Sequence, residues 1–330
     1  MGNAAGRLDT PQIGVVTRHD DLHAYVVQKI LEEQGITCSL LFADSISCVG
    51  GISWSSVWPA QKSAERGSLC NSEGLKVVVG DLDLVWWRRL TGEPCIPVEL
   101  PEGGRKLVAN DCEAALLGMF LTDFRGTWIS PPDATRRASN KLLQLRVAQR
   151  AGLRVPRTLV SQNPESVRAF CAADGGSVVV KPVAGAQDIP LMTGLVRPED
   201  LTDDEIRVCP ATYQEYIPGT RHLRISCFGD ALFTALLETE TLDWRYPLDA
   251  CVTPFELDGD TTSRVCRVLA ELGLRMGMVD MKLDEFGIPV WLEVNPQGQF
   301  MFLEGMCGSL KLSRSFCAFL AEEAERASRR

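Results

Sequence analysis

The stretch VDMKLDEFGIPVWLEVNPQGQF, from Val279 to Phe300, decides the fold that we predict for this chain. Val279 to Leu283 and Val290 to Asn295 alternate as half-buried strands do. Between them, Asp284 to Gly287 has the composition of a tight turn. The stretch therefore predicts a β-hairpin.

Alternation along the two strands places polar side chains on one face of this hairpin. Asp280 and Lys282 point to one side of the first strand, and Glu293 and Asn295 share a face on the second. Apolar residues of the second strand, Leu292 among them, are expected to pack behind. The hairpin thus offers two carboxylates and a carboxamide on one side.

The length of the turn decides how the two carboxylates meet. A four-residue turn places Asp280 opposite Trp291, with Glu293 as a diagonal neighbour on the same face, whereas a loop of six places Asp280 opposite Glu293. In either register the oxygen ligands suit Mg²⁺ that also holds substrate phosphates. The alternative reading is a solvated hairpin face with ordinary acidic residues.

Composition bounds the class of protein. The chain has 330 residues, of which 45% are hydrophobic and 23% charged, which is enough for two or three lobes. The 12 cysteines include no C-x-x-C pair and there are three histidines, which argues against a zinc site and a disulfide framework. A net charge of -9 disfavours nucleic-acid binding through a broad basic surface. We expect a cytoplasmic protein, because we find neither a signal-peptide core nor an apolar run of membrane-spanning length.

The first lobe opens with a βαβ pattern of the Rossmann-like kind. A strand from Ile13 to Thr17, a helix from Leu22 to Gln34 and a strand from Thr37 to Phe42 make up this pattern. No G-x-G-x-x-G follows the first strand, so dinucleotide binding has no support. Glycines and prolines between positions 92 and 104 predict a loop, followed by a helix from about Glu113 to Thr122.

Three basic residues stand where an anionic ligand would use them. Lys141 follows the helix cap Asn140, and a cation in a first turn opposes the helix dipole. Lys181 ends an apolar strand before a small-residue loop, whose backbone could approach phosphates closely. Arg224 alternates along a predicted strand and could contact a phosphate or carboxylate through two nitrogens. Each of them also has an alternative interpretation. Lys141 could simply be exposed, Lys181 could mark the point where a strand meets solvent, and Arg224 could form a surface ion pair.

Taken in order, these pieces resemble an ATP-grasp carboxylate ligase. The order is an Asn-Lys helix start, a strand-end lysine, a QEYI segment, a hairpin carrying Leu-Arg, and then D-x-K and E-V-N. The resemblance is strongest to the ATP-grasp ligases that mature graspetides such as microviridins. It is carried by ASNKLLQLRVAQRAGLRVPRTLVS, VWWRR, the Asp243 to Arg245 triplet and LEVNPQGQF. Departures from the expected pattern are Lys282 for Arg, Gln297 for Asn and Phe300 for Trp.

The resemblance covers nearly the whole chain and implies a fold. It implies an α/β protein with α+β lobes, in which an ATP-grasp fold follows an N-terminal Rossmann-like pre-ATP-grasp domain. The expected domains are residues 1–126, a central lid domain of residues 127–213, and a C-terminal domain of residues 214–330 with the metal site.

The resemblance also implies roles for ten residues. Those expected to bind the phosphates, adenine and ribose of ATP are Lys141, Lys181, Gln214, Glu215 and Ile217. Those expected to hold Mg²⁺ are Asp280, Glu293 and Asn295. Those expected to act on the reacting groups are Arg224, on the γ-phosphate, and Arg245, on the acceptor carboxylate or acyl phosphate. For Arg245 a structural salt bridge is the alternative.

The activity implied is an ATP- and Mg²⁺-dependent carboxylate ligase. It would activate Asp or Glu side chains of a ribosomal precursor peptide, with leader and core, as acyl phosphates and close side-chain ester or amide macrocycles. One alternative is a RimK-like or glutathione-synthetase-like ligase that adds an amino acid to a protein or small acid. Another is a non-catalytic module that binds nucleotide or peptide. No nucleic-acid or membrane partner is expected, and a homodimer is expected from the resemblance alone.

Overall fold

The structure is a computed structural model, and it divides into two compact units. It describes residues 10–46, 51–56, 67–70, 74–90, 96, 99–173, 178–184, 194–242, 244 and 250–329. The first unit comprises Met1–Pro132 with Lys311–Arg330, and the second comprises Asp133–Leu310. The three-domain division, with boundaries after residues 126 and 213, stays a prediction. In the described part of the chain, every helix is too short or too polar to span a bilayer.

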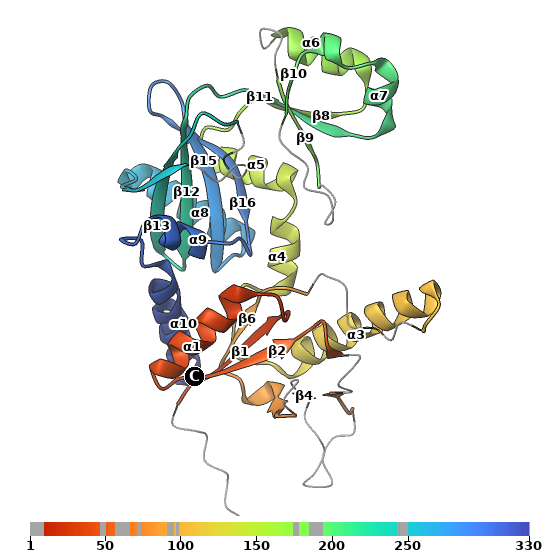
Figure 1. Cartoon of the computed structure of the whole chain (residues 1–330), viewed down its shortest axis with the longest axis vertical. Coiled ribbons are helices and arrows are strands. Elements are labelled where there is room, and N and C mark those ends of the chain that lie inside the picture. Colours follow the sequence, from red (N-terminus) through yellow and green to blue (C-terminus); the bar gives the residue numbers. More distant parts are fainter. Residues whose placement is uncertain are drawn as a thin grey trace, which may run out of the picture. The chain divides into compact units, whose positions relative to one another are not determined.

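A parallel sheet forms the centre of the first unit (Figure 1). Its strand order is β2-β1-β6-β7, and all three strand pairs are parallel. The strands are β1 (Gln12–Thr17), β2 (Thr37–Phe42), β6 (Leu84–Trp87) and β7 (Thr127–Ile129). The helices are α1 (Leu22–Glu33), α3 (Glu102–Asp123) and α10 (Leu312–Ser328). A smaller sheet contains β3 (Ile52–Ser53), β4 (Ser68–Cys70) and β5 (Lys76–Val78), and a 3-10 turn, η1, covers Val79–Asp81. The predicted βαβ opening is confirmed.

Helix α3 begins well before the start that we predicted at Glu113. Pro101, whose backbone is extended, precedes its first residue, Glu102. An acidic side chain in a first turn is favoured by the helix dipole, and Glu102 also pairs with Lys106 at 2.6 Å. These local contacts offset part of the cost of the two glycines that follow Glu102, which we took as loop residues.

A buried polar cluster lies where β1 and β6 end in the first unit. The Arg88 Nε donates to Asp21 Oδ2 at 2.5 Å, and the Thr17 hydroxyl donates to the same oxygen at 2.8 Å. The His23 ring lies beside this pair, with Nδ1 3.9 Å from Asp21 Oδ1. Burial, with a smaller contribution from Arg88, lowers the pKa of His23 from 6.5 to about 4.

We expect the first unit to lose stability when the pH falls from about 6.5 to 4. The pKa of His23 is lower in the folded protein than in the unfolded chain, so the unfolded chain binds the proton first as the pH is lowered. The free energy of unfolding therefore decreases as the pH falls. The full difference in pKa corresponds to about 3 kcal/mol. Thermal unfolding midpoints at pH 7 and pH 5 measure this effect, and His23→Gln should flatten the difference. An unchanged difference between the two midpoints in His23→Gln would contradict the expectation.

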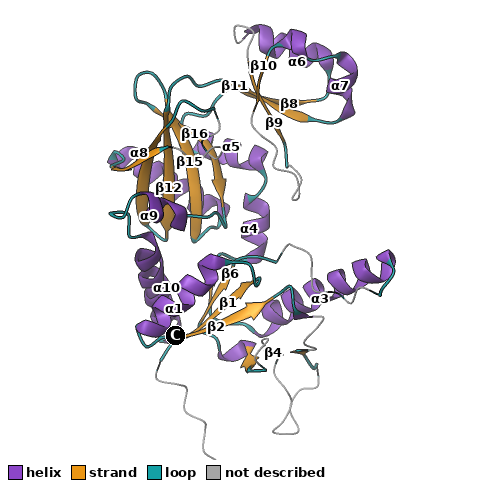
Figure 2. Ribbon diagram, viewed as in Figure 1, coloured by secondary structure: helices purple, strands orange, loops and turns teal. Residues whose placement is uncertain are grey.

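An antiparallel sheet and a smaller sheet form the second unit (Figure 2). The large sheet has strand order β14-β13-β12-β15-β16. These strands are β12 (Arg221–Phe228), β13 (Ala231–Glu238), β14 (Cys251–Phe255), β15 (Met276–Leu283) and β16 (Pro289–Asn295). The helices around it are α4 (Pro132–Ala138), α5 (Lys141–Arg150), α8 (Gly259–Leu272) and α9 (Met301–Met306).

The smaller sheet of this unit has strand order β10-β9-β11-β8. Its strands are β8 (Thr158–Ser161), β9 (Val178–Pro182), β10 (Gly194–Val196) and β11 (Ala211–Glu215). Its helices are α6 (Pro164–Ala173) and α7 (Asp203–Val208), and a 3-10 turn, η2, covers Pro198–Asp200. Val167, Val178 and Tyr213 belong to its own small apolar core.

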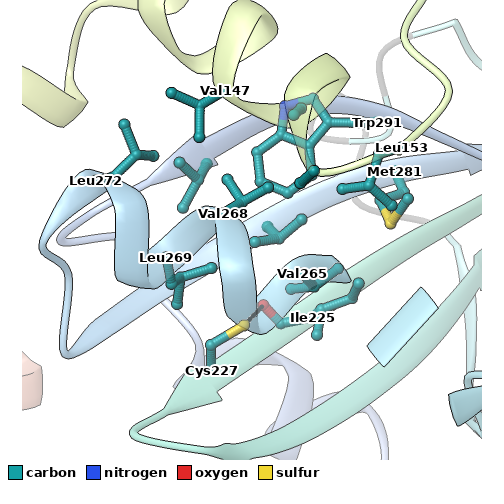
Figure 3. Packing of buried hydrophobic residues seen from close by; sticks show 14 of the residues in the cluster. Val147, Leu153, Ile225, Cys227, Val265, Val268, Leu269, Leu272, Met281 and Trp291 are labelled. Atoms are coloured by element: carbon teal, nitrogen blue, oxygen red, sulfur yellow. Dashed lines mark hydrogen bonds between the residues drawn. The ribbon is translucent and has the colours of Figure 1, made fainter. Parts of the chain in front are cut away.

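The core of the large sheet lies between one of its faces and helices α5 and α8 (Figure 3). Trp291 on β16, Val147 on α5 and Val268 on α8 are completely buried there. Burying side chains of this size contributes about 2 kcal/mol each or more. Because apolar residues occupy this face, alternate residues of β12, β15 and β16 are left for the opposite face. That opposite face carries the candidate site.

Candidate active site

The β15–β16 hairpin pairs Asp280 directly with Glu293. Leu283 pairs with Pro289, so the connection has five residues, from Asp284 to Ile288. The register then shifts by one residue beyond Met281. The four-residue turn was wrong, and the direct carboxylate pair that we predicted for a six-residue loop arises from a five-residue loop and a β-bulge.

The bulge changes which side chains of β16 enter the core. Trp291 pairs with Met281 and Glu293 pairs with Asp280, so Leu292 is the extra residue. Trp291 is fully buried in the core, whereas Leu292 is half-buried and lines a small pocket on the other side. The prediction that Leu292 packs behind the carboxylates was therefore wrong, because an inserted residue reverses the alternation locally.

Arg224 lies directly across from Asp280, on the neighbouring strand β12. Its Nη1 donates to Asp280 Oδ2 at 2.7 Å, and its Nη2 donates to the Gln299 carbonyl at 3.0 Å. The side chains of Arg224 and Asp280 are only 8% and 15% exposed. Water screens such a pair weakly, so the guanidinium is firmly oriented.

Lys141 reaches the second carboxylate. Its Nζ lies 3.1 Å from Glu293 Oε2. Asn140 caps helix α5 through its side chain, as predicted, which places Lys141 in the first turn. The helix is tied to β16 by Gln144, whose amide donates to the Val294 carbonyl at 2.8 Å and accepts from the Val294 N–H at 2.8 Å. These bonds set the position of the α5 N-terminus beside Glu293.

A pocket brings three of the predicted nucleotide-binding residues together. Lys141, Lys181 and Gln214 line it, together with Leu292 and Thr158. Gln214 is 3% exposed, and its amide donates to the Thr158 hydroxyl at 2.8 Å. Two cations from α5 and β9 thus share one pocket wall with an amide from β11. Positions 185–187, in the loop that follows Lys181, lie outside the described residues.

Glu215 and Ile217 do not line this pocket. Glu215 Oε2 accepts from the Arg157 backbone N–H at 2.9 Å, and its other oxygen lies 3.8 Å from Arg154. Ile217 is 4% exposed. Glu215 is therefore held by contacts with other protein residues. That Glu215 and Ile217 bind the nucleotide stays a prediction.

Asn295 and Arg245 complete the predicted set. Asn295 lies two residues after Glu293 on β16, is exposed, and accepts from the Gln297 N–H at 3.1 Å. Alternation places its amide on the face of Glu293. Arg245 lies outside the described residues, so its role stays a prediction.

Sequence reasoning assigned no role to Lys282, although the D-x-K alternation placed it beside Asp280. It is 4% exposed, and burial lowers the pKa of its ammonium group. Its Nζ lies 5.2 Å from the centroid of the Tyr216 ring, in the segment that follows β11. A buried cation therefore links the face of Asp280 to that segment.

The donor set fits Mg²⁺ held partly by a ligand's phosphates. Within the described ranges, no group of three or more His, Cys, Asp and Glu side chains is placed to hold a metal ion. Asp280 and Glu293 supply two carboxylates on paired positions, and Asn295 can add an amide oxygen. Mg²⁺ is commonly bound by one or two carboxylates together with substrate phosphates, so this set suits it.

Gly298 gives Arg224 the space that it occupies. A Cβ at this position would lie 2.7 Å from Met278 Cγ, 2.8 Å from Met278 Cβ and 3.0 Å from Arg224 Nη2. We expect Gly298→Ala to move the Arg224 guanidinium. The rate of the ATP-dependent reaction that the resemblance implies should then fall by roughly 10-fold or more, since small displacements of positioning groups are costly. Steady-state assays of ADP release measure this rate. Gly305→Ala on α9 is the control, because a Cβ there meets nothing within 4 Å. Equal activity of both variants would contradict the expectation.

Solved structures with the same architecture include peptide-modifying ligases. The macrocyclase MdnC of Microcystis aeruginosa, bound with the precursor peptide MdnA, has a TM-score of 0.82 and 26% identity, over 94% of this chain and 99% of that chain. The macrocyclase MdnB of the same organism has a TM-score of 0.75 and 25% identity, over 94% and 99%. The chain has the fold of the graspetide-type ATP-grasp ligases.

A third example of this ATP-grasp fold comes from another organism. A RiPP-associated ATP-grasp ligase of Chryseobacterium gregarium, in complex with ADP and a leader and core peptide, has a TM-score of 0.83 and 23% identity, over 95% of this chain and 97% of that chain. No family model matches the chain, and no curated protein matches it by sequence. The predicted fold class is confirmed.

Proposed function

We propose that this protein is an ATP-dependent ligase that macrocyclises a ribosomally made precursor peptide. The observation that carries the proposal is the pairing of Asp280 with Glu293 beside Arg224 and Lys141, in a fold shared with macrocyclases. Carboxylates paired with cations on one sheet face can separate when a phosphate and a divalent metal arrive. The cations would then neutralise the phosphates, and the carboxylates would be free to hold the metal.

In this proposal the candidate residues bind the metal, the nucleotide or the reacting groups. Mg²⁺, held by Asp280, Glu293 and Asn295, would neutralise charge on the phosphate oxygens. Lys141 and Lys181 hold the nucleotide's phosphates, because both line one pocket. Gln214 in the same pocket, with Glu215 and Ile217 after it, receives the adenine and ribose. Arg224 binds the γ-phosphate, and Arg245 the acceptor carboxylate.

The bond changes balance without a protein nucleophile. An oxygen of a substrate Asp or Glu carboxylate attacks the γ-phosphorus, the bond to ADP breaks, and an acyl phosphate forms. A hydroxyl or amine of the same peptide then attacks the acyl carbon, loses its proton and expels phosphate. The net result is loss of one water from the peptide, with ATP converted to ADP and phosphate. The four basic side chains supply the positive charge that this transfer requires.

Mass spectrometry of the reaction tests the proposal against both alternatives. The protein is incubated with ATP, Mg²⁺ and a short candidate precursor, rich in Thr or Lys and in Asp or Glu, encoded beside its own gene. Loss of the mass of water supports cyclisation. Gain of a residue mass when free amino acids are added would support the RimK-like or glutathione-synthetase-like alternative. Bound nucleotide without any mass change would indicate a binding module.

The proposal extends to the cellular location of the enzyme and to its recognition of the precursor. A cytoplasmic location would supply ATP and Mg²⁺, and none of the cysteines in the described ranges forms a disulfide. The precursor would be recognised partly through its leader. The homodimer stays a prediction.

A further inference from the structure

The Arg224 guanidinium lies over the ring of Trp244. The Arg224 Cζ lies 5.7 Å from the centroid of the Trp244 ring, which is within the range of a cation–π contact. Trp244 lies between β13 and β14, and its ring stacks on Phe302 of α9 with centroids 5.6 Å apart and planes 19° apart. Phe302 thus packs against the indole that contacts Arg224.

Two hydrogen bonds and one ring contact hold the Arg224 guanidinium in place. Nη1 donates to Asp280 and Nη2 donates to the Gln299 carbonyl. Both bonds lie near the plane of the guanidinium and limit motion within that plane. The contact with the indole ring adds a third restraint, which neither hydrogen bond supplies.

We propose that Trp244 is a positioning residue that holds the Arg224 guanidinium at the angle needed for the transferring phosphate. The need is greatest in the reacting complex. There, Asp280 would be shared with the metal that the proposed function requires, which would weaken its bond to Arg224. The indole of Trp244 is uncharged and would not bind the metal, so its contact with Arg224 would persist. The inference rests on the proposed function for what Arg224 does, whereas the contact itself is independent of it.

The kinetic test compares Trp244→Leu with Trp244→Phe. We expect Trp244→Leu to lower kcat for ATP-dependent peptide modification by about 10-fold, with the KM for ATP changed less than about 2-fold. Trp244→Phe keeps an aromatic face and should stay within about 3-fold of the parent. The matched control is Phe286→Leu, an aromatic residue that is 79% exposed in the β15–β16 connection, which should leave kcat unchanged. Equal losses in the Phe and Leu variants would overturn the proposal.

A double-mutant cycle separates positioning of Arg224 from general support of the loop. In an Arg224→Lys background, which lacks the planar group, Trp244→Leu should cost less than about 3-fold. The same loss in both backgrounds would show that Trp244 acts through something other than Arg224.

Arginine side-chain NMR tests the contact without turnover. The Arg224 Nε–H resonance, assigned by its disappearance in Arg224→Lys, should be displaced by the indole ring current and should lie nearer its ordinary position in Trp244→Leu. An undisplaced resonance in the parent protein would overturn the proposal, even if Trp244→Leu does not fold. If the parent forms no product, the proposed function fails, while the resonance still decides whether Trp244 orients Arg224.

Discussion

Glu293→Gln is expected to abolish ATP-dependent turnover, with a loss of about 10²-fold or more. The substitution keeps the volume and one oxygen but removes the negative charge that faces Asp280 across the bulge. The carboxylate is 28% exposed and its partner Lys141 is 33% exposed, so loss of the ion pair should cost less than about 1 kcal/mol of stability. Turnover is measured by ADP release and peptide mass, and folding by thermal melting.

The same hairpin supplies the control for this prediction. Glu285 is exposed in the β15–β16 connection, and Glu285→Gln removes an equal charge eight residues before Glu293. Its turnover should match that of the parent. Near-normal turnover in Glu293→Gln, with an intact melting transition, would remove Glu293 from the metal site.

Arg224→Lys is expected to lower kcat by about 10²-fold while the chain stays charged at this position. A lysine ammonium has no planar fork, so it cannot reproduce the donor pair that contacts Asp280 and the Gln299 carbonyl. We also expect a small fall in the thermal unfolding midpoint, because Asp280 is only 15% exposed and keeps a weaker partner.

Arg221→Lys on the same strand is the control. Arg221 lies at the start of β12, is half-exposed, and its Nη2 donates to the Asp284 carbonyl at 3.5 Å. Its kcat should remain within about 2-fold of the parent. If Arg224→Lys and Arg221→Lys lower kcat equally, the effect lies in β12 as a whole and not in the contacts of Arg224.

Helix α5 shows how much of the fold local chemistry could predict. Its start at Lys141 follows from the Asn140 cap, and its end follows from Gly152, whose φ is +87°. Both signals lie within a few residues of the helix, so no distant contact is needed to read them. Helix α3 was predicted too short because its first turn contains two glycines, which we read as loop, although the helix begins at Glu102.

The candidate site divides in the same way. The alternation of Asp280 with Lys282, and of Glu293 with Asn295, predicted which side chains share a face, because side-chain direction along a strand follows from the backbone. Leu292 was misplaced because an apolar residue at that position indicates burial in an unbroken strand. A bulge is decided by the partner strand, so no pattern within β16 alone reveals it.

The sequence by itself determined the order of the motifs and predicted the oxygen ligands and the basic residues of the candidate site, and hence the class of chemistry that we propose. Only the tertiary structure decided that Asp280 faces Glu293, that Lys141 and Arg224 each pair with one of these carboxylates, and that Trp244 contacts the Arg224 guanidinium. The physical reason is that strand register and ring contacts depend on long-range packing. Trp291 enters the core beneath α5 and α8, and this burial favours the register in which the extra residue is Leu292.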